Sequence, residues 1–233
     1  LEGSFQKYGD TAKLIIQLIK PGKEQHVWSN EYDRNWKEIF SVQSEVAQAI
    51  AKELQAVITP LEKQLIEKIP TADLTAYDAY LKGEFYLYKA TENDLDTAMQ
   101  CFELAKDKDP QFARAYAGIG LVWIFRQQLG WAHPDEAGTK GMAAIMRALE
   151  LDSTIAEVHY TLAGINVYRM WDWKAGESAF NKAIAINPNY AEAHGMYSHL
   201  LNMVGRPKEA MEHIELALKL DPVRLLIADD VGV

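Results

Sequence analysis

The chain of 233 residues contains a single cysteine, Cys101. An intrachain disulfide needs two cysteines, so a disulfide scaffold is excluded, and the composition favours a reducing, cytoplasmic compartment. No run of about 18 apolar residues occurs, so we expect no segment that inserts into a membrane. The chain begins at Leu1 without a signal-peptide pattern. We interpret it as a piece of a longer protein, whose other parts could associate with a membrane.

Positive charge is scarce as well. Lys and Arg number 24 against 33 Asp and Glu, which gives a net charge of −9. Nucleic-acid phosphates and anionic membrane surfaces both attract clustered Lys and Arg, so we expect neither as a partner. A basic polypeptide would be attracted instead. The composition, 48% hydrophobic and 24% charged, is that of an ordinary globular protein.

Motifs for catalysis or cofactor binding are also missing. There is no P-loop lysine motif, and Gly118-Ile119-Gly120 follows no strand pattern, so these glycines are expected to serve helix packing. His194 and His199 are five residues apart, whereas residues that share a helix face are three or four apart. No cysteine or acidic pair completes a tetrahedral metal site, and Cys101 has no neighbouring base. We therefore expect no catalytic residue, cofactor or metal in this chain.

The second half of the sequence has an internal repeat. A small residue is followed after four positions by a large apolar residue, after three more by alanine, and after five more by a helix-stopping residue. Steps of four and three keep one helix face in register, and proline cannot continue a helix. The four sets are Ala98, Phe102, Ala105 and Pro110; Gly141, Ile145, Ala148 and Ser153; Gly176, Phe180, Ala183 and Pro188; and Ala210, Ile214, Ala217 and Pro222.

The spacing of the sets is 43, 35 and 34 residues, counted from one small residue to the next. The last value matches the period of about 34 residues of a common class of helix-pair repeat. The second unit is the longest, and it contains the helix breakers Gly130 and Pro134 between Phe125 and Gly141. These breakers predict a longer loop between the two helices of that unit.

A further helix precedes each set. It places a bulky residue beside a small one where two helices would cross, as in residues 116–120, 159–163 and 194–198. These units resemble tetratricopeptide repeats over about residues 71–222, and residues 224–233 resemble the start of a fifth unit. The resemblance implies a curved solenoid of about four helix pairs that binds polypeptides on the concave face of the first helices.

The first 69 residues follow another pattern. The dipeptides Gly9-Asp10 and Pro21-Gly22 predict turns between three β-rich segments. Ser41 is predicted to cap a helix that runs through Val42 and Ile50. Pro60 is predicted to bend or end this helix, and a second piece is expected to reach Ile69. The expected order of elements is therefore β-β-β-α.

This first segment resembles the C-terminal part of a TolB-like domain, a domain that precedes tetratricopeptide repeats in bacterial signalling and regulatory proteins. The matching stretches are residues 1–4, 17–19, 28–34 and 39–45. The resemblance implies that an adenylate-cyclase-type or DNA-binding domain can belong to the parent protein. Such a domain would lie outside the present chain.

The helix spacing also selects candidates for a peptide-binding groove. The selected face is aromatic and mildly acidic, with one basic residue, so it favours an apolar or basic segment over a carboxylate terminus. That segment could be a foreign peptide or the chain's own helix between residues 42 and 69, and each candidate could instead only pack the solenoid. The candidates are Arg114, Ala117, Leu121 and Phe125 in the second unit; Glu157, Tyr160, Gly164 and Tyr168 in the third; and Glu192, Gly195, His199 and Asn202 in the fourth.

The sequence thus predicts a mainly α protein. Residues 1–69 are expected to form a partial α/β element with a long helix, and residues 70–233 a tetratricopeptide solenoid whose last repeat is truncated. We expect a protein–protein interaction or scaffolding module of a larger bacterial signalling protein, without enzyme activity of its own. The alternatives are the regulatory portion of an adenylate-cyclase-type enzyme or transcription regulator, and a module for homo-oligomerisation.

The N-terminal element leads to a first prediction. If the parent domain has strands before Leu1, this chain carries an unpaired sheet edge, and such edges promote pairing between chains. We expect a homodimer formed through the first seventy residues. Light scattering after size exclusion should give a dimer mass for the full chain and a monomer mass for a fragment that starts at Thr71. The same association state for both would contradict the prediction.

Overall fold

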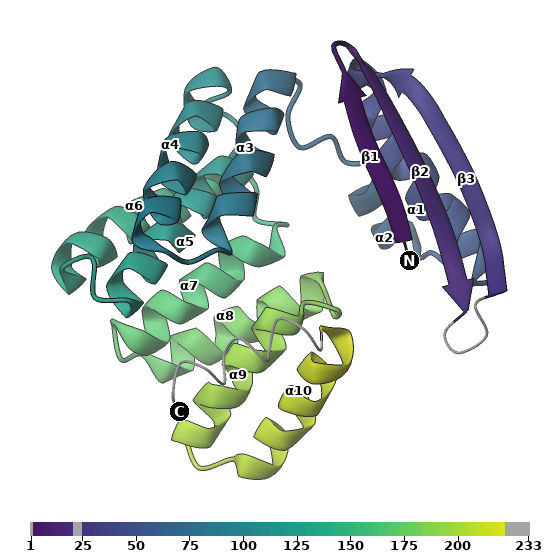
Figure 1. Cartoon of the computed structure of the whole chain (residues 1–233). Helices are drawn as coiled ribbons and strands as arrows, with labels where there is room; N and C mark the ends of the chain where they lie inside the picture. The colour runs from purple at the N-terminus through teal and green to yellow at the C-terminus, as the bar shows by residue number, and fades with distance from the viewer. Residues whose placement is uncertain (1, 21–24, 222–233) are drawn as a thin grey trace. The chain divides into compact units, whose positions relative to one another are not determined.

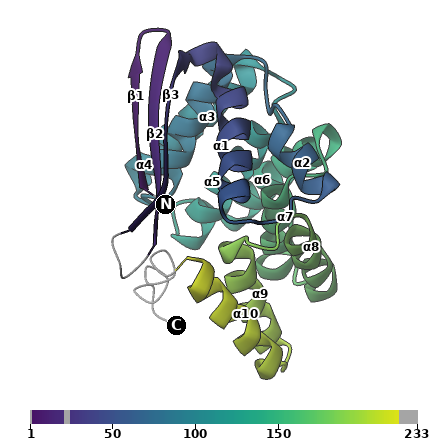
Figure 2. The same cartoon turned by 90° about the vertical axis from the view of Figure 1, so that its right-hand side faces the viewer.

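The computed structural model describes residues 2–20 and 25–221, and the chain divides into two compact units, residues 1–72 and 73–233. The first unit contains a three-stranded antiparallel sheet and two α-helices, and the second contains eight α-helices in four pairs within the described residues (Figures 1 and 2). The prediction of a mainly α fold, with paired helices after a β-β-β-α element, is confirmed.

The sheet has the order β1-β2-β3. Gly9 and Asp10 connect β1 to β2, and Tyr8 pairs with Thr11 across this turn. Gly9 has a φ of 57°, a left-handed conformation that glycine adopts without steric cost. The predicted hairpin turn is therefore confirmed, whereas the predicted turn at Pro21-Gly22 lies outside the described residues. The strands are β1 (Glu2–Tyr8), β2 (Thr11–Lys20) and β3 (Gln25–Asn35).

The two faces of the sheet differ in polarity, because successive side chains of a strand point to opposite sides. Ala12 and Ile16 of β2 and Tyr32 of β3 share one face and are buried. On the other face, Lys13 Nζ lies 2.7 Å from the carboxylate of Glu31, and both side chains are exposed. The sheet therefore buries one face and presents the other to solvent.

The strands lead into helix α1 (Ile39–Glu53) through a 3-10 turn, η1 (Trp36–Glu38). Ile39 and Val42 are the buried residues of α1. Ser41 was predicted as the N-cap, and this is wrong, because Glu38 takes that position and Ser41 lies in the first turn. The Ser41 hydroxyl donates instead to the carbonyl of Glu38, at 2.8 Å.

A second helix, α2 (Pro60–Glu67), begins after Thr59. The Thr59 hydroxyl accepts a bond from the backbone N–H of Glu62, and the Glu62 carboxylate accepts one from the backbone N–H of Thr59. This reciprocal pair stabilises a helix start, where backbone N–H groups have no helical partner. Residues 54–59 separate α1 from α2, so the predicted second helical piece is present, and Pro60 begins it.

In the second unit each pair consists of a helix A followed by a helix B. Each later helix A packs against the helix B that precedes it and against the helix A of the preceding pair (Figure 1). The pairs are α3 (Leu74–Leu87) with α4 (Glu92–Lys108), α5 (Ala113–Gln128) with α6 (Pro134–Leu151), α7 (Ala156–Tyr168) with α8 (Trp173–Ile186), and α9 (Ala191–Met203) with α10 (Pro207–Leu220).

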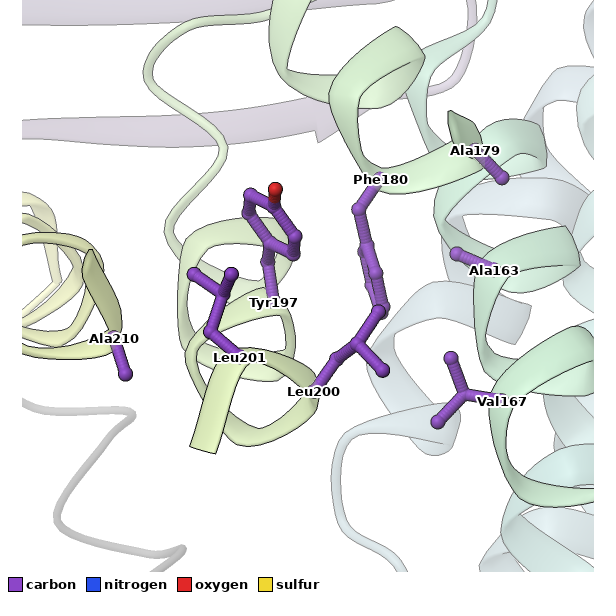
Figure 3. Close-up of a cluster of buried hydrophobic side chains, with 8 residues drawn as sticks. All are labelled: Ala163, Val167, Ala179, Phe180, Tyr197, Leu200, Leu201 and Ala210. Atoms are coloured by element: carbon purple, nitrogen blue, oxygen red, sulfur yellow. The ribbon is translucent and has the colours of Figure 1, made fainter. Parts of the chain in front are cut away.

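The repeat residues line the contacts between these helices. The small residue, the large residue and the alanine of every set are buried, except that Ile214 is half-buried. Figure 3 shows how one set is used: Phe180 of α8 lies between Ala163 and Val167 of α7 and Tyr197 of α9. Its ring centroid is 5.7 Å from that of Tyr197. One aromatic side chain thus joins the third pair to the fourth.

The extra length of the second unit lies mostly in its helices. α5 has 16 residues where α9 has 13, and Gly141 is the eighth residue of α6 where Ala210 is the fourth of α10. The loop at residues 129–133 is only two residues longer than the loop at 204–206. The predicted longer loop is therefore confirmed, but it supplies only a small part of the extra length. Pro134 stands at the start of α6, where its missing N–H costs nothing, and helix α6 simply begins earlier.

The first two pairs approach one another closely around Phe102. Its ring lies between Gly83 of α3 and Gly118 of α5, and a Cβ at either glycine would lie 2.6 Å from a ring carbon. Phe102 has no exposed surface. The ring therefore cannot move away from one glycine without moving toward the other.

We expect Gly118→Ala to lower the free energy of unfolding by about 1–3 kcal/mol, the usual cost of overpacking a dense core. The matched variant is Gly164→Ala in α7, where the new Cβ would lie at 3.7 Å from Ile124 Cδ1, an ordinary contact. That variant should be neutral or stabilising by up to about 1 kcal/mol, because alanine favours helices over glycine. Urea unfolding followed by circular dichroism measures both, and equal midpoints would contradict the close packing.

Candidate functional site

The predicted groove residues lie on the helices A of the second, third and fourth pairs. Ala117 and Leu121 are buried, at 3% and 6% exposure, whereas His199 and Asn202 are exposed. Gly195 is also buried, and the other candidates are half-buried. The candidates therefore range from packing positions to fully accessible ones.

Five of these candidates meet at one cavity of about 260 Å³, which we call the helix-A cavity. Arg114, Ala117 and Leu121 come from α5, Glu157 from α7 and Glu192 from α9. The cavity also contains residues that the spacing argument missed, from α3 and from the turn before α9. These are Tyr80, Glu84, Tyr88, Asn187, Asn189 and Tyr190. The other candidates, Phe125, Tyr160, Gly164, Tyr168, Gly195, His199 and Asn202, do not line it.

Arg114 is engaged inside the cavity. Its Nη1 lies 3.9 Å from Oε1 of Glu157, and Tyr80 is close enough to favour its charge. Burial disfavours the charge on Arg114, but Glu157 and Tyr80 outweigh this effect and raise its pKa. Burial also raises the pKa of Tyr80, so its hydroxyl is neutral. Arg114 therefore connects α3, α5 and α7, which is a structural role for the basic residue of the predicted groove.

Tyr190 is the residue immediately before α9 and is 9% exposed. Within the described part of the chain its hydroxyl has no hydrogen-bond partner. Burial, followed by the nearby Tyr160 and Glu157, raises the pKa of Tyr190 and keeps the phenol neutral. The sequence did contain a signal for it, because a bulky residue precedes the first alanine of α5, α7 and α9: Phe112, Ile155 and Tyr190.

Tyr160, a groove candidate, has its ring inside the stack. Its centroid is 6.3 Å from that of Phe180 and 5.2 Å from that of Tyr190. Burial raises the pKa of the Tyr160 phenol, so it too is neutral. Tyr160 therefore packs the third pair against the fourth.

Three side chains at matching helix-A positions bond to the turn before their own helix. The hydroxyl of Tyr116 donates to the carbonyl of Pro110 at 3.2 Å. His159 Nε2 lies 2.9 Å from the carbonyl of Ser153, and His194 Nε2 lies 3.0 Å from that of Pro188. These bonds join residues six apart and hold the helix start. The two histidines therefore lie at packing positions.

No set of three or more His, Cys, Asp or Glu among the described residues could hold a metal ion. Burial raises the pKa of the half-buried Cys101 thiol, which lowers its thiolate content. None of the helices in residues 2–20 and 25–221 is long and apolar enough to cross a membrane.

His194 also contacts a second histidine, His213 of α10. Their Nδ1 atoms are 2.7 Å apart, and the ring centroids are 5.0 Å apart. One of these nitrogens must donate and the other accept, so the contact tolerates a single proton between them. Burial, followed by His194, lowers the pKa of His213, although Glu212 and Glu209 oppose the shift. The folded protein therefore resists protonation of His213.

This pair predicts a stability that depends on pH. Below about pH 6.5 an unfolded histidine takes up a proton that folded His213 resists, so the free energy of unfolding should fall as the pH is lowered. Urea titrations between about pH 8 and pH 5 should show a smaller fall for His213→Gln. The control His199→Gln, at an exposed position on α9, should keep the slope of the parent. Superimposable profiles for the parent and His213→Gln would contradict the prediction.

The stacked pairs define a helical repeat protein, and comparison with known proteins agrees. Residues 179–212, which span α8 to α10, match the tetratricopeptide repeat family. The crystal structure of TTC0263, a tetratricopeptide protein of Thermus thermophilus, covers 83% of this chain and 96% of its own, with a TM-score of 0.52 and 15% identity. That likeness shows the fold. Residues 179–212 therefore match a tetratricopeptide repeat, and the stacked helix pairs have the fold of such repeats.

Two curated relatives are distant, and one is named an adenylate cyclase and the other a transcription regulator. The "Putative adenylate cyclase 3" of Rhizobium meliloti (strain 1021) is 28% identical over 165 residues, which is 70% of this chain and 28% of that protein. The "Transcriptional regulator HilA" of Salmonella typhimurium is 26% identical over 145 residues, which is 62% of this chain and 26% of the regulator. The chain thus spans less than a third of the length of either relative.

Proposed function

We propose that this chain is the protein-interaction module of a larger bacterial signalling or regulatory protein, and that it holds a polypeptide on the exposed side of its helices A. The observation that carries this proposal is that the two helices of each pair contribute differently. The repeat residues are buried between stacked helices, while α3, α5, α7 and α9 contribute side chains to a common cavity. Stacked helix pairs of this kind present extended binding surfaces.

The relatives support a role that is independent of any one output. An adenylate cyclase and a transcription regulator differ in what their parent proteins do, yet both match most of this chain. Matches of 165 and 145 residues cannot lie side by side in 233, so they overlap. A shared segment in two such proteins suits recognition or regulation. The catalytic or DNA-binding activity would then lie outside residues 1–233, and the chain itself would do no chemistry.

Self-association is the second candidate function. All seven residues of β1 are exposed, and β1 is an edge of the sheet. An exposed edge strand presents unpaired backbone groups to a strand of another chain. The resemblance of this unit to a TolB-like domain, which carried the homodimer prediction, belongs to the same proposal.

Phe125 provides the sharpest test of the groove, because Tyr160 packs against Phe180 and Tyr190 and its loss would also cost stability. Peptides of 15 residues selected from a random display library on the full chain should protect α5, α7 and α9 from hydrogen exchange. Phe125→Ala should weaken their binding about tenfold, the effect of losing an anchor residue. The control is Leu104→Ala on helix B α4, where Leu104 is 45% exposed.

Circular dichroism should show unchanged helicity for both variants. Protection on the helix-B side, or equal losses of affinity for Phe125→Ala and Leu104→Ala, would contradict a groove on the helices A.

A further inference from the structure

The helix-A cavity has an excess of negative charge. It is lined by Glu84 of α3, Glu157 of α7 and Glu192 of α9, against the single cation Arg114. Arg114 is already engaged with Glu157 and with Tyr80. Carboxylates therefore outnumber cations in the lining by two, and they come from the first, third and fourth helix pairs.

Tyr190 gives an independent sign that the cavity accepts a hydrogen-bond donor. Its side chain is more than nine-tenths buried, its hydroxyl has no partner among the described residues, and it lines the cavity. A neutral phenol can accept a hydrogen bond as well as donate one. A cationic donor placed in the cavity would satisfy it.

Aromatic faces complete the environment of a cation. Tyr80 and Tyr88 of α3 line the same cavity as the carboxylates. Tyrosine rings attract ammonium and guanidinium groups through the negative potential of their faces, and the effect grows when the cation leaves water. An anionic ligand, in contrast, would meet the excess of carboxylates and an arginine that is already occupied.

We propose that the helix-A cavity binds the side chain of a lysine or arginine in the partner polypeptide. The carboxylates of Glu84 and Glu192 supply the charge, and the Tyr190 hydroxyl accepts one N–H bond. This inference rests on the proposed function, because it assumes that a polypeptide lies along the helices A, and it adds the chemistry of the anchoring residue. Free polyamines share the charge of this ligand and are an arm of the test.

The test uses the full chain and peptides of 15 residues selected on it from a random display library. We expect each groove-binding peptide to contain one lysine or arginine whose replacement by norleucine or citrulline weakens binding about tenfold. The double variant Glu84→Gln and Glu192→Gln should weaken binding of the unchanged peptide by a similar factor. It should hardly affect the peptide with norleucine or citrulline, because the change in the protein and the change in the peptide remove the same interaction. Tyr190→Phe should weaken binding severalfold, and the control Glu215→Gln on the exposed side of α10 should not.

The outcomes separate this inference from the function on which it rests. Peptides that protect the helices A but bind equally well with norleucine, or equally well to the double variant, would overturn the lysine or arginine anchor alone. Peptides that protect another surface would contradict the groove itself. Spermidine that binds more tightly than every selected peptide would assign the cavity to a free polyamine and overturn the proposal.

A second measurement needs no selected peptide. Titration with Nα-acetyl-lysine amide should shift the backbone amide signals of Tyr190 and Glu192 in nuclear magnetic resonance spectra, and Nα-acetyl-norleucine amide should not. The absence of any lysine-dependent shift would also overturn the proposal. The shift should shrink as salt is added, because the attraction is between charges.

Discussion

The second unit depends on how closely its helices approach one another. Phe102 fills the space between α3, α4 and α5 only because Gly83 and Gly118 present no side chain to its ring. Phe180 fills the corresponding space between α7, α8 and α9, beside Ala163. Dense packing of this kind tolerates almost no change in volume. The stacking of one pair on the next, and every surface that it creates, therefore depends on a few small residues.

That stacking also determines which side chains remain for recognition. The repeat residues of the helices B are buried in contacts with the helices A. The cavity is lined by residues from α3, α5, α7 and α9. Arg114 bridges three of these helices through Glu157 and Tyr80. Arg114 therefore stabilises the packing of these helices. The other charged residues of the lining, Glu84 and Glu192, are acidic, in keeping with the net charge of −9.

Much of this could be predicted from the sequence, since the spacing of Ala98, Phe102 and Ala105 is a local helical signal that recurs four times. The helix boundaries of the second unit could not be predicted, because Pro134 can follow the end of one helix or begin the next, and this depends on the surrounding residues. Tyr190 was missed for a related reason. It precedes its helix, so counting along the helix face passes over it, and its place in the cavity depends on α3, about a hundred residues earlier.

The walls of the cavity come from four successive helices A, so its shape depends on the angle between every pair and the next. In a solenoid whose pairs contact only their neighbours, small rotations between pairs add up along the stack and determine its curvature. A ligand that contacts both α3 and α9 must therefore favour one curvature over the others. Binding in the cavity and the curvature of the stack are then coupled, so each changes the equilibrium of the other. Tension applied along the stack would therefore change the affinity for the bound ligand.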